Sequence, residues 1–117
     1  YNCGELCPNG ADPIVSPDLK WPQLVYSHEE GCAIVGGVPI RDPELPAFMG
    51  RLIYGDFCRG RVRTAVPHSP TIIDDQPAGF SLPRKHGVAL LNGFATDGMN
   101  TIYAFSHYGG IYRLIQR

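Results

Sequence analysis

The feature that most constrains the fold is a β-hairpin pattern that occurs twice, 49 residues apart. In residues 50–66, GRLIYGDFCRGRVRTAV, two runs rich in β-branched and aromatic side chains flank a short polar segment, which is typical of a hairpin with a tight connection. Residues 100–116, NTIYAFSHYGGIYRLIQ, repeat the pattern and bring Tyr103 into the position of Tyr54. A strand-built repeat of this length is typical of propeller blades, whose sheets bury their faces against neighbouring sheets. The sequence therefore predicts consecutive blades.

The length of the chain limits how many blades it holds. Its 117 residues, 44% hydrophobic and 18% charged, are globular in composition. At roughly 40–50 residues per blade there is room for about two, whereas closed propellers have about four to eight. We expect an all-β chain of about two antiparallel blades with long irregular loops. We also expect it to be a piece of a larger protein or a fragment that assembles.

Turn residues divide the chain into four parts. Residues 1–23 form an irregular arm rich in cysteine and proline, because this density of proline excludes a regular helix and most ladder pairing. Residues 24–73 form one blade, residues 74–87 a loop, and residues 88–117 a further, partial blade. The order of strand, turn and hairpin thus occurs twice.

Single strands outside the hairpins are expected at three places. Cys32–Ile40 is rich in β-branched residues, and its Gly36-Gly37 pair indicates either a bulge or a close approach by another backbone or a ligand. Thr71–Ile73 and Val88–Ala95 are the other expected strands. Leu24–His28 is expected to be a short extended segment.

Two groups have a functional and a simpler interpretation. Asp74 and Asp75 could bind Ca²⁺ through their carboxylates, but an exposed acidic turn is the more frequent arrangement. His28 could be a ligand or a base, but a histidine that bonds a backbone carbonyl at a strand end is more frequent. We expect no metal site in this chain.

The charge balance excludes some partners. With a net charge of −1, no general attraction for nucleic acid or for an anionic membrane is expected. No apolar run approaches the roughly 20 residues that span a bilayer. We therefore expect partners to be recognised by small groups of residues rather than by the overall charge.

Four cysteines in a short chain favour an oxidising location, secreted or periplasmic. We favour a Cys32–Cys58 disulfide, because the strand after Gly31 and the turn at Cys58 would belong to one sheet. Cys3 and Cys7 would then close a small local loop. Four free thiols or a metal site remain the alternatives, although the spacing of Cys3 and Cys7 without a second pair is weak support for zinc.

Several motifs resemble one known family. The run YSHEEGCAIVGGVPIRDPELPAFMGRLIYGDFCRGR resembles the pattern Y-S-H-x-x-G-C-S-x-T-G-G-x-x-Y-R-G, followed by P-x-L-x-G-x-Y-x-x-G-D-F-C-S-G-R, near the C-terminal end of the glucose/sorbosone dehydrogenase family. The tail SHYGGIYRLIQR resembles the end of that family's final blade. The family includes soluble sugar dehydrogenases that depend on pyrroloquinoline quinone (PQQ) and the hedgehog-interacting proteins.

The resemblance implies a six-bladed propeller in which 24–73 is the penultimate blade and 88–117 the final one. In the enzymes, PQQ and Ca²⁺ sit at the top of the central channel, and a histidine takes the proton from the sugar while hydride passes to the quinone. That base and the calcium ligands belong to earlier blades. By the resemblance this region supplies cationic contacts to PQQ, for which Arg61 is the first candidate and Arg59 the second, because a guanidinium binds carboxylates bidentately. The alternative is that Arg61 pairs with Asp56 across the turn or lies on the exterior.

Two departures from the family pattern bear on these expectations. Ile34-Val35-Gly36-Gly37 lacks the usual threonine, and Pro39 removes a backbone donor, which predicts an edge or distorted strand.

Two functions follow. The first is a C-terminal fragment of a PQQ-dependent sugar dehydrogenase, in which an aldose is oxidised in the complete protein while the isolated chain is not catalytic. The second is a non-catalytic binding or structural module derived from the same fold, since fold alone does not establish chemistry. In either case two isolated blades would expose an inter-blade face and open edges, so the expected partners are the remaining blades, other chains or further copies of this chain.

Overall fold

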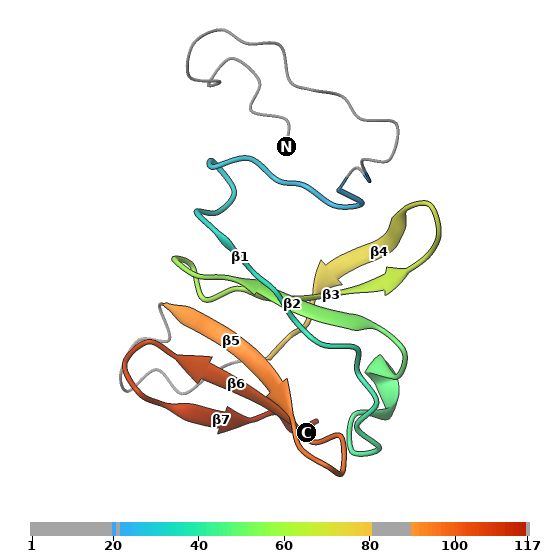
Figure 1. The fold of residues 1–117 in the computed structure, drawn as a ribbon, viewed down its shortest axis with the longest axis vertical. Helices are drawn as coiled ribbons and strands as arrows, with labels where there is room; N and C mark the ends of the chain where they lie inside the picture. Colours follow the sequence, from blue (N-terminus) through green and yellow to red (C-terminus); the bar gives the residue numbers. More distant parts are fainter. Residues whose placement is uncertain (1–19, 21, 81–89, 117) are drawn as a thin grey trace, which may run out of the picture.

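The structure is a computed structural model that describes residues 20, 22–80 and 90–116, and it is all-β. Two antiparallel sheets account for every strand in this part of the chain, as expected (Figure 1). The first sheet contains, in order, β1 (Ile34–Val35), β2 (Leu52–Asp56), β3 (Val62–Pro67) and β4 (Ile72–Pro77). The second contains β5 (Leu91–Thr96), β6 (Ile102–Ser106) and β7 (Ile111–Arg113). The one described helical segment is a single 3-10 turn, η3 (Pro46–Phe48).

Both predicted hairpins are present, as β2–β3 and β6–β7. A glycine amide closes each turn. The amide of Gly60 donates to the carbonyl of Asp56, four residues earlier, and the amide of Gly109 donates to the carbonyl of Ser106, three residues earlier, each over 3.0 Å. Gly60 and Gly109 have φ of 57° and 89°, in the left-handed region that glycine adopts without steric cost. The glycine repeated in the sequence thus serves the same purpose in both turns.

The strand registers refine the repeat of 49 residues. Gly55 pairs with Val62 in the first hairpin, and Phe105 pairs with Ile111 in the second. The second strands therefore keep the spacing of 49, whereas the first strands are related by 50, because the second turn is one residue shorter. The blade-like unit is repeated with a small deletion in its turn.

The strand predicted over Cys32–Ile40 is much shorter than expected. Only β1 belongs to the sheet, and beyond it Pro39 makes one isolated bridge to Leu52. The backbone of Gly37 lies against the carbonyl of Ile53 so closely that a β-carbon would collide with it. The expected close approach of another backbone is therefore confirmed at Gly37, and the edge position predicted from Pro39 is confirmed by the strand order.

The fourth strand is longer than expected. The strand predicted at Thr71–Ile73 is β4, Ile72–Pro77, so the first residues of the loop predicted over 74–87 belong to a strand. Its last four residues, Asp-Asp-Gln-Pro, have low β-propensity, and arginine side chains support their backbone pairing with β3. Most of the 1–23 arm and the segment 81–89 lie outside the described residues.

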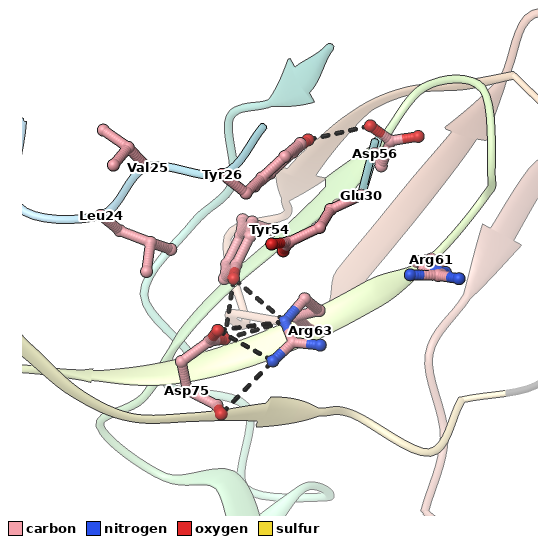
Figure 2. A pocket seen from close by; sticks show the side chains of 10 residues that line it. Leu24, Val25, Tyr26, Glu30, Tyr54, Asp56, Arg61, Arg63 and Asp75 are labelled. Atoms are coloured by element: carbon pink, nitrogen blue, oxygen red, sulfur yellow. Dashed lines mark hydrogen bonds and ion pairs between the residues drawn. The ribbon is translucent and has the colours of Figure 1, made fainter. Parts of the chain in front are cut away.

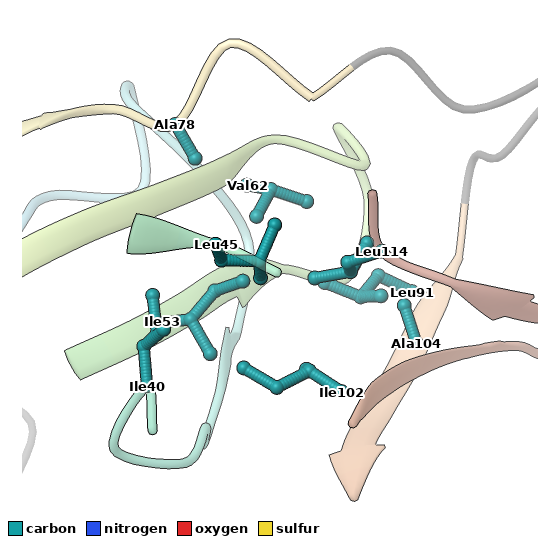
Figure 3. Close-up of a cluster of buried hydrophobic side chains, with 9 residues drawn as sticks. All are labelled: Ile40, Leu45, Ile53, Val62, Ala78, Leu91, Ile102, Ala104 and Leu114. Atoms are coloured by element: carbon teal, nitrogen blue, oxygen red, sulfur yellow. The ribbon is translucent and has the colours of Figure 1, made fainter. Parts of the chain in front are cut away.

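The hydrophobic core fills the space between the two sheets (Figure 3). Ile53 and Val62 point from the first sheet toward Ile102 and Leu91 of the second, and Gly55 leaves room for the Leu91 side chain. Each such aliphatic side chain contributes about 1.5–3 kcal/mol when fully buried. The remaining members of this core are Ile40, Leu45, Ala78, Ala104 and Leu114. The packing of the sheets against each other therefore provides most of the apolar stabilisation.

Polar contacts fix how the sheets are oriented. Asp42 is 1% exposed, and its carboxylate accepts hydrogen bonds from the amides of Glu44 (2.9 Å) and Ile102 (3.4 Å). Arg113 forms an ion pair with Glu44. These contacts join the β1–β2 connection to the second sheet.

The disulfide predicted between Cys32 and Cys58 is present, with a Cα–Cα distance of 5.8 Å. It links the approach to β1 with the turn of the β2–β3 hairpin. Cys3 and Cys7 lie outside the described residues. Within those residues no helix is long and apolar enough to cross a membrane.

Candidate functional site

A pocket lies on the outer face of the first sheet, away from the second sheet (Figure 2). Alternation along the strands accounts for its position, because Ile53 and Gly55 face the core while Tyr54 and Asp56 face outward. The segment 24–30 forms the opposite wall, and the cavity has a volume of about 110 Å³. Its lining consists of Leu24, Val25, Tyr26, Glu30, Tyr54, Gly55, Asp56, Arg61, Arg63 and Asp75.

The floor of the pocket is a connected polar triad from three strands. The Tyr54 hydroxyl donates to Oδ1 of Asp75 over 2.7 Å. Nε of Arg63 donates to the Tyr54 hydroxyl at 3.1 Å and to Asp75 at 2.9 Å, and Nη2 of Arg63 donates to Oδ2 of Asp75 at 2.8 Å. The Arg63–Asp75 pair is therefore bidentate, which is the strong form of this interaction.

A second carboxylate, that of Asp56, connects the segments that form the pocket wall. Oδ2 of Asp56 accepts hydrogen bonds from the Tyr26 hydroxyl at 2.9 Å and from the amides of Cys32 and Ala33 at 2.8 and 3.2 Å. Oδ1 accepts from the amide of Arg59 at 2.8 Å. Four donors thus satisfy one carboxylate that is 5% exposed, and they tie residues 26–33 to the hairpin turn.

These contacts set the charge states of the groups. Burial, with a smaller contribution from the bond to Asp75, raises the pKa of Tyr54 to about 12, and burial together with Asp56 raises that of Tyr26 to about 12. Burial alone would raise the pKa of Asp56, but its four donors outweigh that effect and lower the pKa below its ordinary value. The pKa of Asp75 is lowered against burial by Arg63 and Tyr54. At neutral pH both tyrosines are uncharged and both carboxylates are ionised.

The side chains of Asp74 and Asp75 lie on opposite faces of the sheet. Asp74 pairs with Arg51 at 2.6 Å on the face that carries Thr64, whereas Asp75 binds Arg63 on the pocket side. The two carboxylates are therefore each neutralised by a different arginine and do not converge on one ion. In the described residues no three histidine, cysteine, aspartate or glutamate side chains gather as a metal site.

The two predicted cofactor contacts lie in different places. Arg61 is exposed at the rim of the pocket, and its carbonyl rather than its side chain contacts Asp56. Arg59 lies at the hairpin turn, where Nη2 donates to the carbonyl of Glu29 at 3.0 Å. His28 is exposed in the turn before Gly31 and does not line the pocket.

The pocket itself does not fit PQQ. Its lining carries the carboxylates of Glu30, Asp56 and Asp75 against two guanidiniums, and that of Arg63 is already paired. Such a lining repels a ligand that bears several carboxylates. The volume of about 110 Å³ is also well below the roughly 300 Å³ of the smallest usual ligand sites. The roles of Arg61 and Arg59 toward PQQ stay predictions about a larger protein.

Several residues of this pocket were not expected from the sequence. In the sequence, Tyr26 and Glu30 belong only to the run YSHEEG, and Tyr54 and Arg63 belong only to predicted strands. Their alternation in β2 and β3 placed Tyr54 and Arg63 on one face once the register was known. No local sequence pattern predicts that the segment 24–30 covers that face.

Comparison of the chain with models of known protein families, with curated proteins and with solved structures finds no match.

Proposed function

We propose that this chain forms the last two blades of a six-bladed β-propeller of the glucose/sorbosone dehydrogenase kind. Within that propeller it acts as a structural and partner-binding portion rather than as the catalytic portion. The observation that supports this most directly is the repeat of one antiparallel unit in two sheets that pack face to face. Neighbouring blades pack in this way.

Among the described residues, the outer face of the second sheet is available for further contacts. Phe105 and Ile111 are paired on the outer face of the second sheet, where Ile111 is 66% exposed. Tyr108, in the adjoining turn, is 67% exposed. Exposed apolar side chains that lie together commonly mark an interaction surface, and in the proposed propeller a neighbouring sheet would cover them.

The state of the carboxylates favours the non-catalytic role. Asp56 and Asp75 are held as ions by several donors each, and a general base must instead have a free lone pair near the reacting proton. In this proposal they stabilise the sheet and its covering segment. The Cys32–Cys58 disulfide supports a secreted or periplasmic location for the assembly.

The test is the association state of the purified chain, measured by size-exclusion chromatography with light scattering over a range of concentrations. We expect a mass above the 12.8 kDa of one chain, rising with concentration. Replacement of Ile111 by Ser should shift the equilibrium toward the monomer, whereas replacement of Met99, which is 75% exposed, should not. A stable monomer at all concentrations would contradict the proposal.

The catalytic alternative is supported by the exposed Arg61 side chain at the pocket rim, which forms no ion pair with another described residue. It predicts that the complete protein reduces an artificial electron acceptor when given PQQ, Ca²⁺ and an aldose. It also predicts that Arg61→Gln weakens PQQ binding, followed by quinone absorbance. No absorbance change in the complete protein would reject this alternative.

A further inference from the structure

We propose that the pocket on the outer face of the first sheet accepts the ammonium group of a lysine side chain from a partner protein. The inference deepens the proposed partner-binding role by stating the chemistry of the contact. Binding of a small cation can be measured on the chain alone, so its failure is distinguishable from failure of the propeller assembly.

The charges around the pocket favour a cation. Arg63 and Asp75 neutralise each other, and Asp56 is satisfied by four donors. Glu30 and Arg61 are the remaining charges, and neither forms an ion pair with another described residue. The lining as a whole carries one more carboxylate than guanidinium.

The position of Glu30 makes its carboxylate the accessible one. Figure 2 shows Glu30 reaching over the pocket beside the ring of Tyr54, while Arg61 lies at the far end. Tyr26 and Tyr54 supply aromatic rings, which attract cations through their faces, and both rings stay uncharged because their hydroxyls have a raised pKa. The ammonium would thus meet a carboxylate and aromatic rings together.

The size and the apolar part of the pocket favour a side chain. A cavity of about 110 Å³ is too small for a typical free ligand but can hold one extended side chain. Leu24 and Val25 provide an apolar wall, and Val25 is 73% exposed. The methylene groups of lysine would cover this wall while the ammonium reaches Glu30, as long cationic side chains commonly do.

The experiment is an NMR titration of the full chain with N-acetyl-lysinamide, following the ring resonances of Tyr26 and Tyr54. We expect saturable shifts of both rings. The analogue that is acetylated on Nε keeps the shape and loses the charge, so it should bind at least about five-fold more weakly, the loss typical of one partly exposed charge contact.

The matched variants are Glu30→Gln and Glu29→Gln, which remove the same charge from adjacent exposed residues of one turn. Only Glu30 lines the pocket. We expect Glu30→Gln to weaken binding about five-fold and Glu29→Gln to change it less than two-fold. Arg61→Gln should strengthen binding, because it removes a cation from the rim.

Three results would overturn the inference. The first is the absence of ring shifts up to about 50 mM ligand, which corresponds to negligible affinity. The second is equal loss in Glu29→Gln and Glu30→Gln, which would indicate general surface charge. The third is tighter binding of butyrate than of N-acetyl-lysinamide, which would assign the pocket to an anion held by Arg61.

Discussion

Asp56 is the residue that connects most parts of the first sheet. Its carboxylate joins Tyr26, the approach to β1 and the turn that carries Arg59. The Cys32–Cys58 disulfide lies beside the same contacts, so a covalent and a polar link reinforce each other. This arrangement holds the pocket wall in place.

Replacement of Asp56 by Asn should lower the free energy of unfolding by about 2 kcal/mol, since the amide nitrogen would face a donor that the carboxylate now satisfies. Urea unfolding measures this, with Glu29→Gln as the exposed control that should change little. A change as small as that of the control would show that the four contacts contribute nothing.

The same contacts make stability depend on pH. The pKa of Asp56 is lower in the folded chain than in the unfolded chain, so its contribution is complete above the unfolded value of about 4 and is lost as the pH falls through the folded value. Unfolding between pH 7 and pH 2 should therefore show a loss of stability below about pH 4, and Asp56→Asn should reduce that loss. Asp75 has a lowered pKa as well, so part of the loss should remain.

Few of the residues that line the pocket could be predicted from the sequence. Arg61 is a candidate through the resemblance, but Tyr26 reaches Asp56 from 30 positions earlier in the chain. Glu30 reaches the pocket from the same segment. A hydrogen bond such as Tyr26–Asp56 depends on the tertiary path of the chain, which no local pattern encodes.

At the scale of elements, the paired glycines before β2 have different tasks. A β-carbon on Gly37 would collide with the carbonyl of Ile53, which is backbone and cannot move aside, whereas nothing lies within 4 Å of the same position at Gly36. Neither glycine needs a positive φ. Steric space alone therefore distinguishes them.

Gly37→Ala should lower the free energy of unfolding by about 2 kcal/mol or more, because the chain must separate β2 from the segment beside it. Gly36→Ala should be neutral or slightly stabilising, because alanine restricts the unfolded chain. Thermal unfolding of the two variants makes the comparison. Equal effects would mean that the close backbone contact does not exist.

The hairpins and the presence of the other strands could be predicted, whereas the lengths of β1 and β4 could not. Strands β2 and β3 are joined by a short turn whose glycine and polar residues are visible in the sequence. Strand β1 ends at Val35, and the chain returns to the sheet only at the isolated bridge between Pro39 and Leu52. Strand β4 continues through Asp74 and Asp75, which Arg51 and Arg63 bind. Long-range pairings of this kind override local propensity.

At the scale of the whole molecule, Leu91 tests whether the sheets form one cooperative unit. It is fully buried between the sheets, so Leu91→Ala should lower the free energy of unfolding by about 2–5 kcal/mol. Met99→Ala, at a site that is 75% exposed, is the control and should change it by less than about 0.5 kcal/mol. Calorimetry should show one transition in the parent chain. Two separate transitions would indicate that the sheets fold independently.

The all-β class and the two-sheet organisation could be predicted, because the hairpin pattern occurs twice in the sequence. Two blades do not determine how many blades complete a ring. The predicted number of six therefore rests on the resemblance. The packing of Gly55 against Leu91 could not be foreseen, because it joins residues of different sheets.

Within the first sheet, strand β4 is bound by ion pairs, and the sheet contacts the second sheet through aliphatic side chains. These two contacts respond differently to cold. Strand β4 is mostly exposed and is bound by arginine–aspartate pairs, so its release exposes little apolar surface and involves a small change in heat capacity. The contact between the sheets is aliphatic, and its contribution weakens on cooling. Chilling the chain should therefore loosen the two sheets from each other before it frees the outermost strand.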